Sequence, residues 1–565
     1  MIVSSSPPHP ATRLILSLLR RSRTSLALAT VACVANGISS VMLVATLNRA
    51  LAQPAAADSA LALRFAACAV VALLARMLSG VLFAGLSQDT MASMREQVAA
   101  RVAMSELRDI ERIGAAPVQS VLTDDATNVS MLFFALPNVV MHGSIVAGCL
   151  AYLAWLSWPI CLMALGAIVI GSLGYRLGDQ RALVALEAAG HAQDRLFGCL
   201  GSLFSGAKEL KLHRERAQQF VQGQLGGAIQ EVRGHRRRAF VAYAVGVSWI
   251  VFLFYVFLGL AAFWPTLGAQ VDPHAAAGYV VVFLFMLVPL DGLLNNLPTL
   301  NAARVSLGRI ENVLAEFRPP QMSLVAAAAS DTAAFHTLAL HGVSHAYFHE
   351  RDERMFSIGP IDLSFAPGEL VFIVGGNGSG KTTLAKVLTG LYAPEGGHIE
   401  VDGVKVEPAA LAAYRERFSA VFNDFHLFDA LLGVVDAHGG DHAGLDARAN
   451  ALLATLALDH KVKVIDGAFS TRALSTGQRK RLALVVAYLE DRPFYLFDEW
   501  AADQDPAFKA VFYEQLLPEL TARGKTVVVI THDDRYFPLA DRLLKLDNGA
   551  IVSETHRDPA RRAAA

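Results

Sequence analysis

Hydrophobic residues gather in the first 300 positions of this 565-residue chain, in six long runs separated by polar stretches. A helix needs about 20 mostly apolar residues to cross the roughly 30 Å of hydrocarbon in a bilayer. The runs reach or approach that length, so the pattern predicts six membrane spans. They are residues 26–47, 61–86, 131–156, 158–173, 240–264 and 278–297.

Two long polar stretches interrupt these runs, at 88–129 and 175–238. Within them, segments 91–107 and 183–212 have apolar residues at helical spacing, so we expect helices that extend beyond the spans. Arginine and lysine crowd both stretches and are almost absent from the short loops on the other side. Because cytosolic segments carry the excess of positive charge, the long stretches and both termini are predicted to be cytosolic.

The overall composition agrees with a membrane part joined to a soluble part. Hydrophobic residues make up 54% of the chain and charged residues 18%, against roughly 25% charged in an ordinary soluble domain. The formal net charge of -1 gives no basic surplus, so no nucleic-acid partner is expected. The five cysteines have no metal-ligand spacing, and we expect neither a disulfide nor a metal site from them.

Polar side chains inside the sixth run are a candidate substrate site. Asp291 and Asn295 lie one helical turn apart there, and charge in lipid is costly enough that it usually serves a function. They are interpreted as lining a polar cavity, with pairing near the cytosolic helix end as the alternative. Residues 317–335 contain Pro319-Pro320 and an alanine run, which predicts a linker between a membrane domain (1–316) and a soluble domain (336–565).

The soluble part begins with a phosphate-binding loop, GGNGSGKT at 375–382, between an apolar segment (370–374) and a helical one (383–391). Glycines let the backbone N–H groups turn toward phosphates, and the helix N-terminus adds its positive dipole end. Lys381 is expected to reach the terminal phosphates of ATP, and the Thr382 hydroxyl to ligate Mg²⁺. The predicted nucleotide-binding residues here are Gly375, Asn377, Gly378, Ser379, Gly380, Lys381, Thr382 and Thr383.

Two carboxylates follow a second apolar segment, 494–497. Asp498 suits the Mg²⁺ shell, and Glu499 suits the positioning and polarisation of the water that attacks the γ-phosphate. Such a pair is weak evidence alone, but after a phosphate-binding loop it is strong. We therefore expect Glu499 to be the catalytic carboxylate.

The segment Leu474-Ser475-Thr476-Gly477-Gln478 resembles the signature of ATP-binding-cassette (ABC) transporters, whose common form has Gly in place of Thr476. The resemblance implies that Ser475, Gly477 and Gln478 cap the nucleotide held by a partner subunit. It also implies three further roles. His532 becomes the switch histidine near the γ-phosphate, Asp505 part of the loop that bridges two cassettes, and Tyr347 the aromatic residue that stacks on adenine. A core strand residue is the alternative for Tyr347.

One position departs from the family pattern. Where the family usually has Gln after a strand, as a contact for Mg²⁺ and water and a sensor of the membrane domain, this chain has Asn423. Asn keeps the amide but is one methylene shorter. Asn423 is therefore a metal-contact candidate with a shorter reach than Gln, with Asp424 beside it.

Further resemblance narrows the class. The six spans with long cytosolic helices resemble the exporter branch, and the run YLFDEWAADQDP at 495–506 resembles the cyclic-peptide transporter family. That family includes exporters of pyoverdine-type siderophore precursors and of syringomycin-like lipopeptides. The resemblance implies export of a nonribosomal or cyclic peptide, in the first place a siderophore or its precursor, from cytosol to periplasm.

The predicted fold class is a membrane α-helical domain of ABC-exporter type joined to an α/β phosphate-loop nucleotide-binding domain. Because both half-sites are intact in one chain, we expect a homodimer in the bacterial inner membrane, using ATP and Mg²⁺, with lipid around it. A periplasmic or outer-membrane export partner is left open. The alternatives are a lipid or lipopeptide flippase and a membrane regulator that ATP switches without transport.

Overall fold

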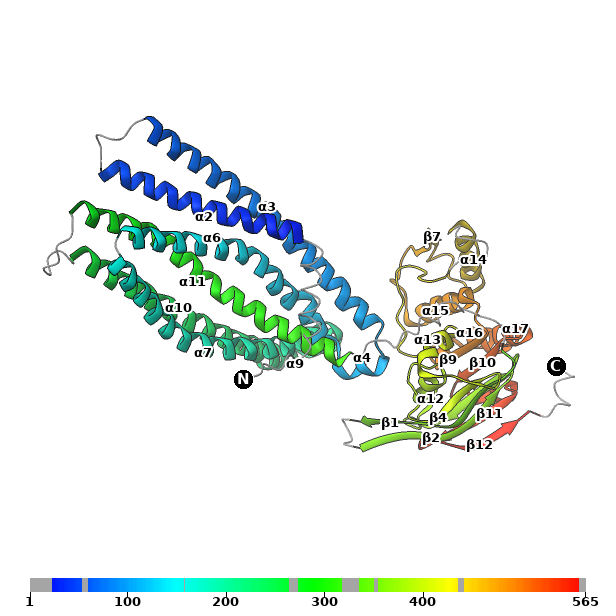
Figure 1. Cartoon of the computed structure of the whole chain (residues 1–565). Helices are drawn as coiled ribbons and strands as arrows, with labels where there is room; N and C mark the ends of the chain where they lie inside the picture. Colours follow the sequence, from blue (N-terminus) through cyan, green and yellow to red (C-terminus); the bar gives the residue numbers. More distant parts are fainter. Residues whose placement is uncertain are drawn as a thin grey trace. The chain divides into compact units, whose positions relative to one another are not determined.

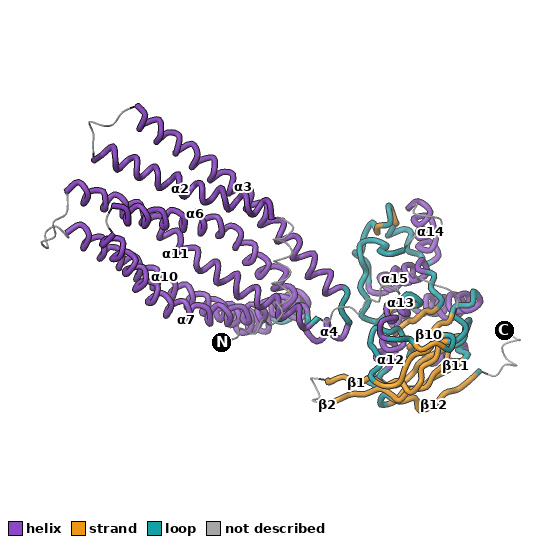
Figure 2. Tube along the Cα trace, viewed as in Figure 1, coloured by secondary structure: helices purple, strands orange, loops and turns teal. Residues whose placement is uncertain are grey.

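The computed structural model describes residues 23–52, 59–156, 158–263, 273–317, 335–349, 354–434 and 442–557. The chain forms two compact units, Met1–Pro319 and Pro320–Ala565. Figure 2 shows that the first is helical and that the strands belong to the second. Apart from its two end residues, the predicted linker 317–335 lies outside the described residues.

The described part of the first unit has six helices long and apolar enough to cross a membrane, as the sequence predicts. In Figure 1 they run side by side as a bundle. The helices that contain the six spans are α2 (Arg23–Ala52), α3 (Ser59–Ala103), α6 (Ala126–Leu156), α7 (Trp158–Ser205), α10 (Gly226–Phe263) and α11 (Pro273–Glu316).

Several of these helices are much longer than a bilayer requires. Helix α7 has 48 residues, which at 1.5 Å per residue is about 70 Å, more than twice the hydrocarbon thickness. The predicted helical segments 91–107 and 183–212 are largely continuations of α3 and α7. Short helices complete these polar ends: α4 (Leu107–Ile113), α5 (Ala115–Ser120), η2 (Val121–Asp125), α8 (Ala207–Leu212), α9 (Arg214–Gln219) and η3 (Phe220–Leu225).

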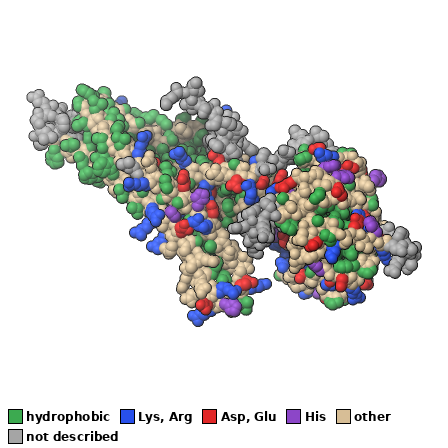
Figure 3. Space-filling model, turned by 90° about the horizontal axis from the view of Figure 1, so that it is seen from below, with side chains coloured by type: hydrophobic (Ala, Val, Ile, Leu, Met, Phe, Trp, Pro, Cys, Tyr) green, Lys and Arg blue, Asp and Glu red, His purple; other side chains and the backbone are tan. Residues whose placement is uncertain are grey.

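The side-chain distribution in the helical unit fits a lipid environment. Phe83, Phe133 and Phe283 pack inside the bundle, yet the outward-facing residues of the spans are also apolar, such as Leu63, which is 72% exposed. In Figure 3, hydrophobic side chains gather at one end of this unit and charged side chains over the remainder. A helix that is apolar all round is stable only when lipid or protein covers it.

The second unit contains a six-stranded sheet in the order β12-β11-β3-β10-β9-β6, in which only the edge strand β12 is antiparallel to its neighbour. A four-stranded antiparallel sheet has the order β2-β1-β4-β5. The strands are β1 (Leu338–His349), β2 (Arg354–Phe365), β3 (Leu370–Gly375), β4 (Gly396–Val401), β5 (Val404–Lys405), β6 (Phe418–Val421), β7 (Val464–Ile465), β8 (Ala468–Phe469), β9 (Phe494–Asp498), β10 (Thr526–Ile530), β11 (Arg542–Asp547) and β12 (Ala550–His556).

Both faces of the six-stranded sheet are buried. Val371 and Ile373 pack with the four-stranded sheet's Leu340, whereas Phe372 faces the opposite core with Phe497, because successive side chains of a strand alternate in direction. This explains why β3, β9 and β10 appear in the sequence as continuous apolar segments. The helices around the sheets are α12 (Lys381–Leu388), η6 (Pro408–Ala410), α13 (Leu411–Arg415), α14 (His442–Thr455), α15 (Thr476–Glu490), η7 (Trp500–Asp503), α16 (Pro506–Val511), η8 (Phe512–Leu516), α17 (Leu517–Ala522) and η9 (Asp534–Leu539).

Candidate active site

The candidate site lies at the carboxyl ends of three neighbouring parallel strands, β3, β10 and β9. Ligands of open α/β sheets bind at this edge, because the loops that leave the strands converge there. Strand β3 leads into the glycine-rich loop, β9 ends at Asp498, and β10 leads through Thr531 to His532. The topology thus brings together residues that are up to 157 positions apart in the sequence (532 − 375).

Glycine is required where the loop leaves β3 and where it enters α12. Gly375 has φ 153°, and a Cβ there would lie 2.2 Å from the Leu546 carbonyl oxygen. Gly380 has φ 99°, and a Cβ there would lie 2.8 Å from Ile358 Cγ2. These positions tolerate neither the added atom nor the left-handed backbone in another residue.

Lys381 places its charge inside the loop. Its Nζ donates to the carbonyl oxygens of Gly375 and Gly376, at 2.9 Å each. Burial lowers the pKa of this lysine, while the charges of Glu499 and Asp498 oppose that shift. An ammonium in this position can bind phosphate oxygens that enter the loop.

Thr382 and Asp498 form the candidate metal pair. The Thr382 hydroxyl donates to Asp498 Oδ2 at 2.9 Å, and Asp498 is 1% exposed. Burial raises the pKa of Asp498, and the Thr382 hydrogen bond opposes the shift. Its other oxygen, Oδ1, has no hydrogen-bond partner among the described residues. A buried carboxylate oxygen with no donor, beside a hydroxyl, fits the oxygen ligands that Mg²⁺ prefers.

Glu499 and His532 face each other across the ends of β9 and β10. The two strands pair in parallel with Asp498 opposite Ile530, and the Glu499 N–H donates to the Ile530 carbonyl at 3.0 Å. Glu499 has φ 50°, a left-handed conformation that turns its side chain out of the strand direction. His532 Nε2 then lies 3.2 Å from Glu499 Oε1. The pair can hold a water or a phosphate oxygen between a base and a donor.

The signature segment forms the N-terminus of α15. Ser475 is its N-cap, accepting from Gln478 N–H, while Gln478 Oε1 accepts from the Ser475 N–H at 3.2 Å, a reciprocal capping box. Ser475 and Thr476 are exposed. Within the described residues, no hydrogen bond or ion pair joins Ser475, Gly477 or Gln478 to the phosphate-binding loop. The segment therefore offers free helix-end donors to a ligand outside its own loop.

Asn423 has a neighbour that sequence reasoning missed. Its Oδ1 lies 3.3 Å from Lys480 Nζ, which also donates to the Glu499 carbonyl oxygen and pairs with Asp503 Oδ2, each at 2.8 Å. Lys480 is 2% exposed. The signal was present in helical spacing, because Lys480 stands three and four residues before the buried Ala483 and Leu484. Asn423 thus contacts the lysine that also binds the backbone of Glu499.

Trp500 holds the backbone of Lys480. Its indole N–H donates to the Lys480 carbonyl oxygen at 2.7 Å, and its ring stacks on Phe512 with centroids 4.3 Å apart. Asp505 caps α16 by accepting from the Phe508 N–H at 2.9 Å, which with the nearby Arg481 lowers the pKa of Asp505. The predicted bridging residue is therefore held rigidly at a helix end.

The remaining predicted residues lie apart from this cluster. Tyr347 lies in β1 with its backbone opposite Phe356, and its side chain is outside the described part. Asp291 and Asn295 are exposed on α11, where Asn295 Nδ2 donates to Asp291 Oδ2 at 2.9 Å. Asp291 and Asn295 therefore pair with each other on the surface of the sixth span.

Known proteins with similar features define the class. The ABC transporter family profile matches residues 358–502. The whole chain is 35% identical over 528 residues to the ATP-binding protein SyrD of Pseudomonas syringae pv. syringae, covering 92% of each chain. The chain belongs to the ABC transporter family, and it is an exporter that couples ATP hydrolysis to transport, a membrane protein with a cytosolic ATPase domain.

One further relative and one solved structure are also similar to this chain. The ATP-dependent lipid A-core flippase of Burkholderia thailandensis is 27% identical over 498 residues, which is 86% of this chain and 81% of that one. Among solved structures, a bacterial Atm1-family ABC exporter with ATP bound superposes with a TM-score of 0.77 at 18% identity, covering 97% of both chains. That structural likeness shows the shared fold.

Proposed function

We propose that this chain is half of a homodimeric pump that exports a nonribosomal or cyclic peptide, a siderophore or its precursor, from the cytosol to the periplasm. The inner membrane of a bacterium is its proposed location. The observation that carries the proposal is the joining of six spans to a soluble unit whose Thr382–Asp498 and Glu499–His532 pairs meet at one sheet edge. The run 495–506, with its resemblance to cyclic-peptide transporters, supports the peptide cargo.

Mg²⁺ fits the buried end of the site. Thr382 and Asp498 would hold it, because Asp498 has an oxygen without a donor among the described residues. A bound divalent ion supplies charge neutralisation for the β- and γ-phosphates. The ion would also stabilise the ionised carboxylate that burial disfavours. Asn423 is proposed to act on the metal site indirectly, through Lys480, since its amide oxygen faces Lys480.

Hydrolysis is assigned to three side chains. Lys381 would neutralise the terminal phosphate charge that builds up during transfer. Glu499 would orient and polarise the attacking water, and His532, 3.2 Å from its carboxylate, would hold the γ-phosphate side in place. Both groups follow rigid buried strands, which keeps the water and the phosphate in a fixed mutual geometry.

The exposed signature segment supports a dimer. Ser475, Gly477 and Gln478 lie at the capped N-terminus of α15. Within the described residues, they form no hydrogen bond with the phosphate-binding loop of their own chain. In a two-fold pair, each segment can bind the γ-phosphate of ATP held by the other chain. ATP binding would close the pair, and hydrolysis would release it, which shifts the membrane unit between two states.

ATP hydrolysis in lipid tests the proposal. The purified full-length protein is assayed with a panel of peptide siderophores, with Glu499→Gln as the control. We expect one peptide class to stimulate hydrolysis by the wild type. Glu499→Gln should still bind ATP but lose at least about 100-fold in turnover, the usual contribution of a general base. Rapid turnover by Glu499→Gln would contradict the assignment of the catalytic carboxylate.

A lipid or lipopeptide flippase is the second candidate, favoured by the 27% identity to a lipid A-core flippase. The same assay separates the two. Stimulation by lipid alone, with no response to any peptide, would support the flippase. A protein that binds ATP without hydrolysing it under any condition would support the non-transporting regulator instead.

A further inference from the structure

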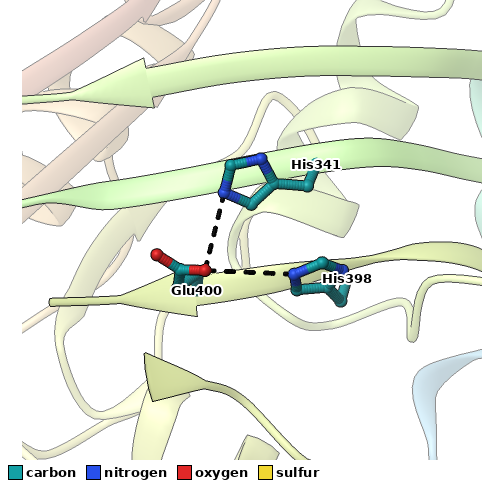
Figure 4. Close-up of side chains that lie close together, drawn as sticks. All are labelled: His341, His398 and Glu400. Carbon is teal, nitrogen blue, oxygen red and sulfur yellow. Dashed lines mark ion pairs between the residues drawn. The ribbon is translucent and has the colours of Figure 1, made fainter. Parts of the chain in front are cut away.

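Three metal-ligating side chains meet on the four-stranded sheet, outside the candidate ATP site. His341 belongs to β1, and His398 and Glu400 belong to β4 (Figure 4). The register places His341 directly opposite His398, and Glu400, two residues further along, shares the same face. The intervening Leu340 and Ile399 are buried in the core, so the three polar side chains project from the outer face.

The distances between the ligand atoms of these residues are close to those found around a bound ion. His341 Nε2 is 3.7 Å and His398 Nε2 is 4.0 Å from the same oxygen, Glu400 Oε2. One ligand atom from each residue lies within 4.8 Å of the others. Zinc ligands at about 2.0–2.2 Å in a tetrahedral arrangement are roughly 3.4 Å apart. Small side-chain rotations would therefore close the set around one ion.

We propose that His341, His398 and Glu400 bind a divalent transition-metal ion such as Zn²⁺. Two imidazole nitrogens and one carboxylate are ligands for borderline metals, whereas Mg²⁺ and Ca²⁺ prefer an all-oxygen shell. The three side chains are partly exposed, at 48%, 37% and 31% for His341, His398 and Glu400. Solvent can therefore reach the ion and complete its coordination, as water does where a protein supplies three ligands.

A lysine lies beside the three side chains. Lys405 on β5 is the cross-strand neighbour of Glu400, but its Nζ lies 3.8 Å from Glu407 and so has a counter-charge of its own. An ion held by the three ligands would join β1 to β4. Because the unfolded chain does not assemble these ligands, binding stabilises the folded unit by an amount that grows with the logarithm of the free metal concentration above the dissociation constant.

Metal binding by the full-length protein tests the proposal. The protein, in detergent, without ATP and with its affinity tag removed, is freed of metal and titrated with Zn²⁺ against a chromophoric chelator. We expect one equivalent per chain. His398→Ala and Glu400→Gln should each weaken binding by at least about tenfold, since even outer-shell partners contribute 10–100-fold. His460→Ala is the matched control, because His460 is exposed in the same unit and, among the described residues, pairs only with Asp459.

A second readout reports which ligands surround the ion. Co²⁺ absorption bands should change in the ligand variants and remain unchanged in the control. Thermal unfolding of the metal-free variants at the wild-type temperature would show that the substitutions leave the fold intact. Equal Zn²⁺ binding by wild type, His398→Ala and Glu400→Gln would overturn the proposal, and so would an equal loss of binding in His460→Ala.

Discussion

Lys480 carries a buried charge next to the candidate catalytic glutamate. A buried ammonium is costly unless it is paired and hydrogen-bonded, and here three oxygens satisfy it, from Asn423, Glu499 and Asp503. Its bond to the Glu499 backbone carbonyl holds the residue that is proposed to orient water. We therefore assign Lys480 as a positioning residue, which acts through Glu499.

Substitution of Lys480 tests that role. Lys480→Ala is expected to lower kcat by up to about 100-fold, because small displacements of a catalytic group are costly, while KM for ATP changes little. Lys480→Gln still supplies an N–H donor, from its side-chain amide, and should recover part of the activity. Arg479→Ala, at the exposed neighbouring position, is the control. A fall in kcat for Arg479→Ala equal to that for Lys480→Ala would contradict the assignment.

Glu490, at the end of α15, makes the free energy of unfolding depend on pH. Burial raises its pKa, and the hydrogen bond from Ser419 Oγ to its carboxylate at 2.5 Å opposes this. The raised pKa means that its contribution to stability is present below the unfolded pKa, about 4.3, and is lost as pH rises through the folded value. The buried carboxyl of Glu490 therefore favours the folded state less at pH 7 than at low pH.

Glu490→Gln should then unfold at a higher temperature than the wild type at pH 7. The difference should narrow as the pH is lowered toward about 4.3, where the wild-type carboxyl also becomes neutral. Calorimetry of the full-length protein at several pH values measures it. Glu514→Gln, at an exposed position, should show no such difference. A variant less stable than the wild type at pH 7 would contradict the argument.

Sequence motifs predict individual site residues, whereas the contacts around those residues become visible only in the structure. Lys381, Thr382 and Asp498 are predictable because each belongs to a short motif whose chemistry fixes the residue type. The contact between Asn423 and Lys480 joins residues 57 positions apart and depends on how α15 packs beside β6, the strand that precedes Asn423. Motif spacing contains no information on such packing.

At the scale of elements, the first turn of α15 is packed against the segment after Glu499. A Cβ on Gly477 would lie 2.9 Å from the Asp503 carbonyl oxygen, and Gln504 Nε2 donates to the Gly477 carbonyl at 3.0 Å. Thr476, one residue earlier, is exposed and free of that contact. The glycine requirement of the signature thus rests partly on packing within this chain.

Paired variants separate the two positions. Gly477→Ala should displace α15 from the 500–504 segment and lower ATP hydrolysis by about tenfold or more, since sub-ångström misplacement is costly at such sites. Thr476→Gly, which restores the family's common form, should keep hydrolysis near the wild-type rate. The ATPase rate of both variants in lipid is the measurement. Full activity of Gly477→Ala would show that the close contact is not a constraint.

Element boundaries were predictable only where the environment determined them. The apolar run 158–173 marks the start of α7 at Trp158, but α7 continues to Ser205. Hydrophobicity detects the part within lipid, whereas the polar extension remains helical through its amphipathic spacing. The apolar segments 370–374 and 494–497 agree with β3 and β9 to within one residue, because burial on both faces makes the whole strand apolar.

At the scale of the whole molecule, the chain joins a lipid-adapted helical unit to a unit that binds and hydrolyses ATP. Its 35% identity with SyrD extends over 92% of both chains, so the likeness includes both units. What the sequence does not determine is the cargo, because a cavity is formed by helix faces that converge only in three dimensions. Asp291 and Asn295, which share a hydrogen bond on α11, are the residues proposed to contact the cargo through polar groups.

Transport itself tests the central claim most directly. The protein is reconstituted in vesicles with its ATPase domain outside, and uptake of a labelled peptide siderophore is followed with MgATP. We predict accumulation against the gradient by the wild type and none by Glu499→Gln, although the variant binds ATP. Equal uptake by both proteins, or rapid ATP hydrolysis with no movement of any peptide, would contradict ATP-driven peptide export.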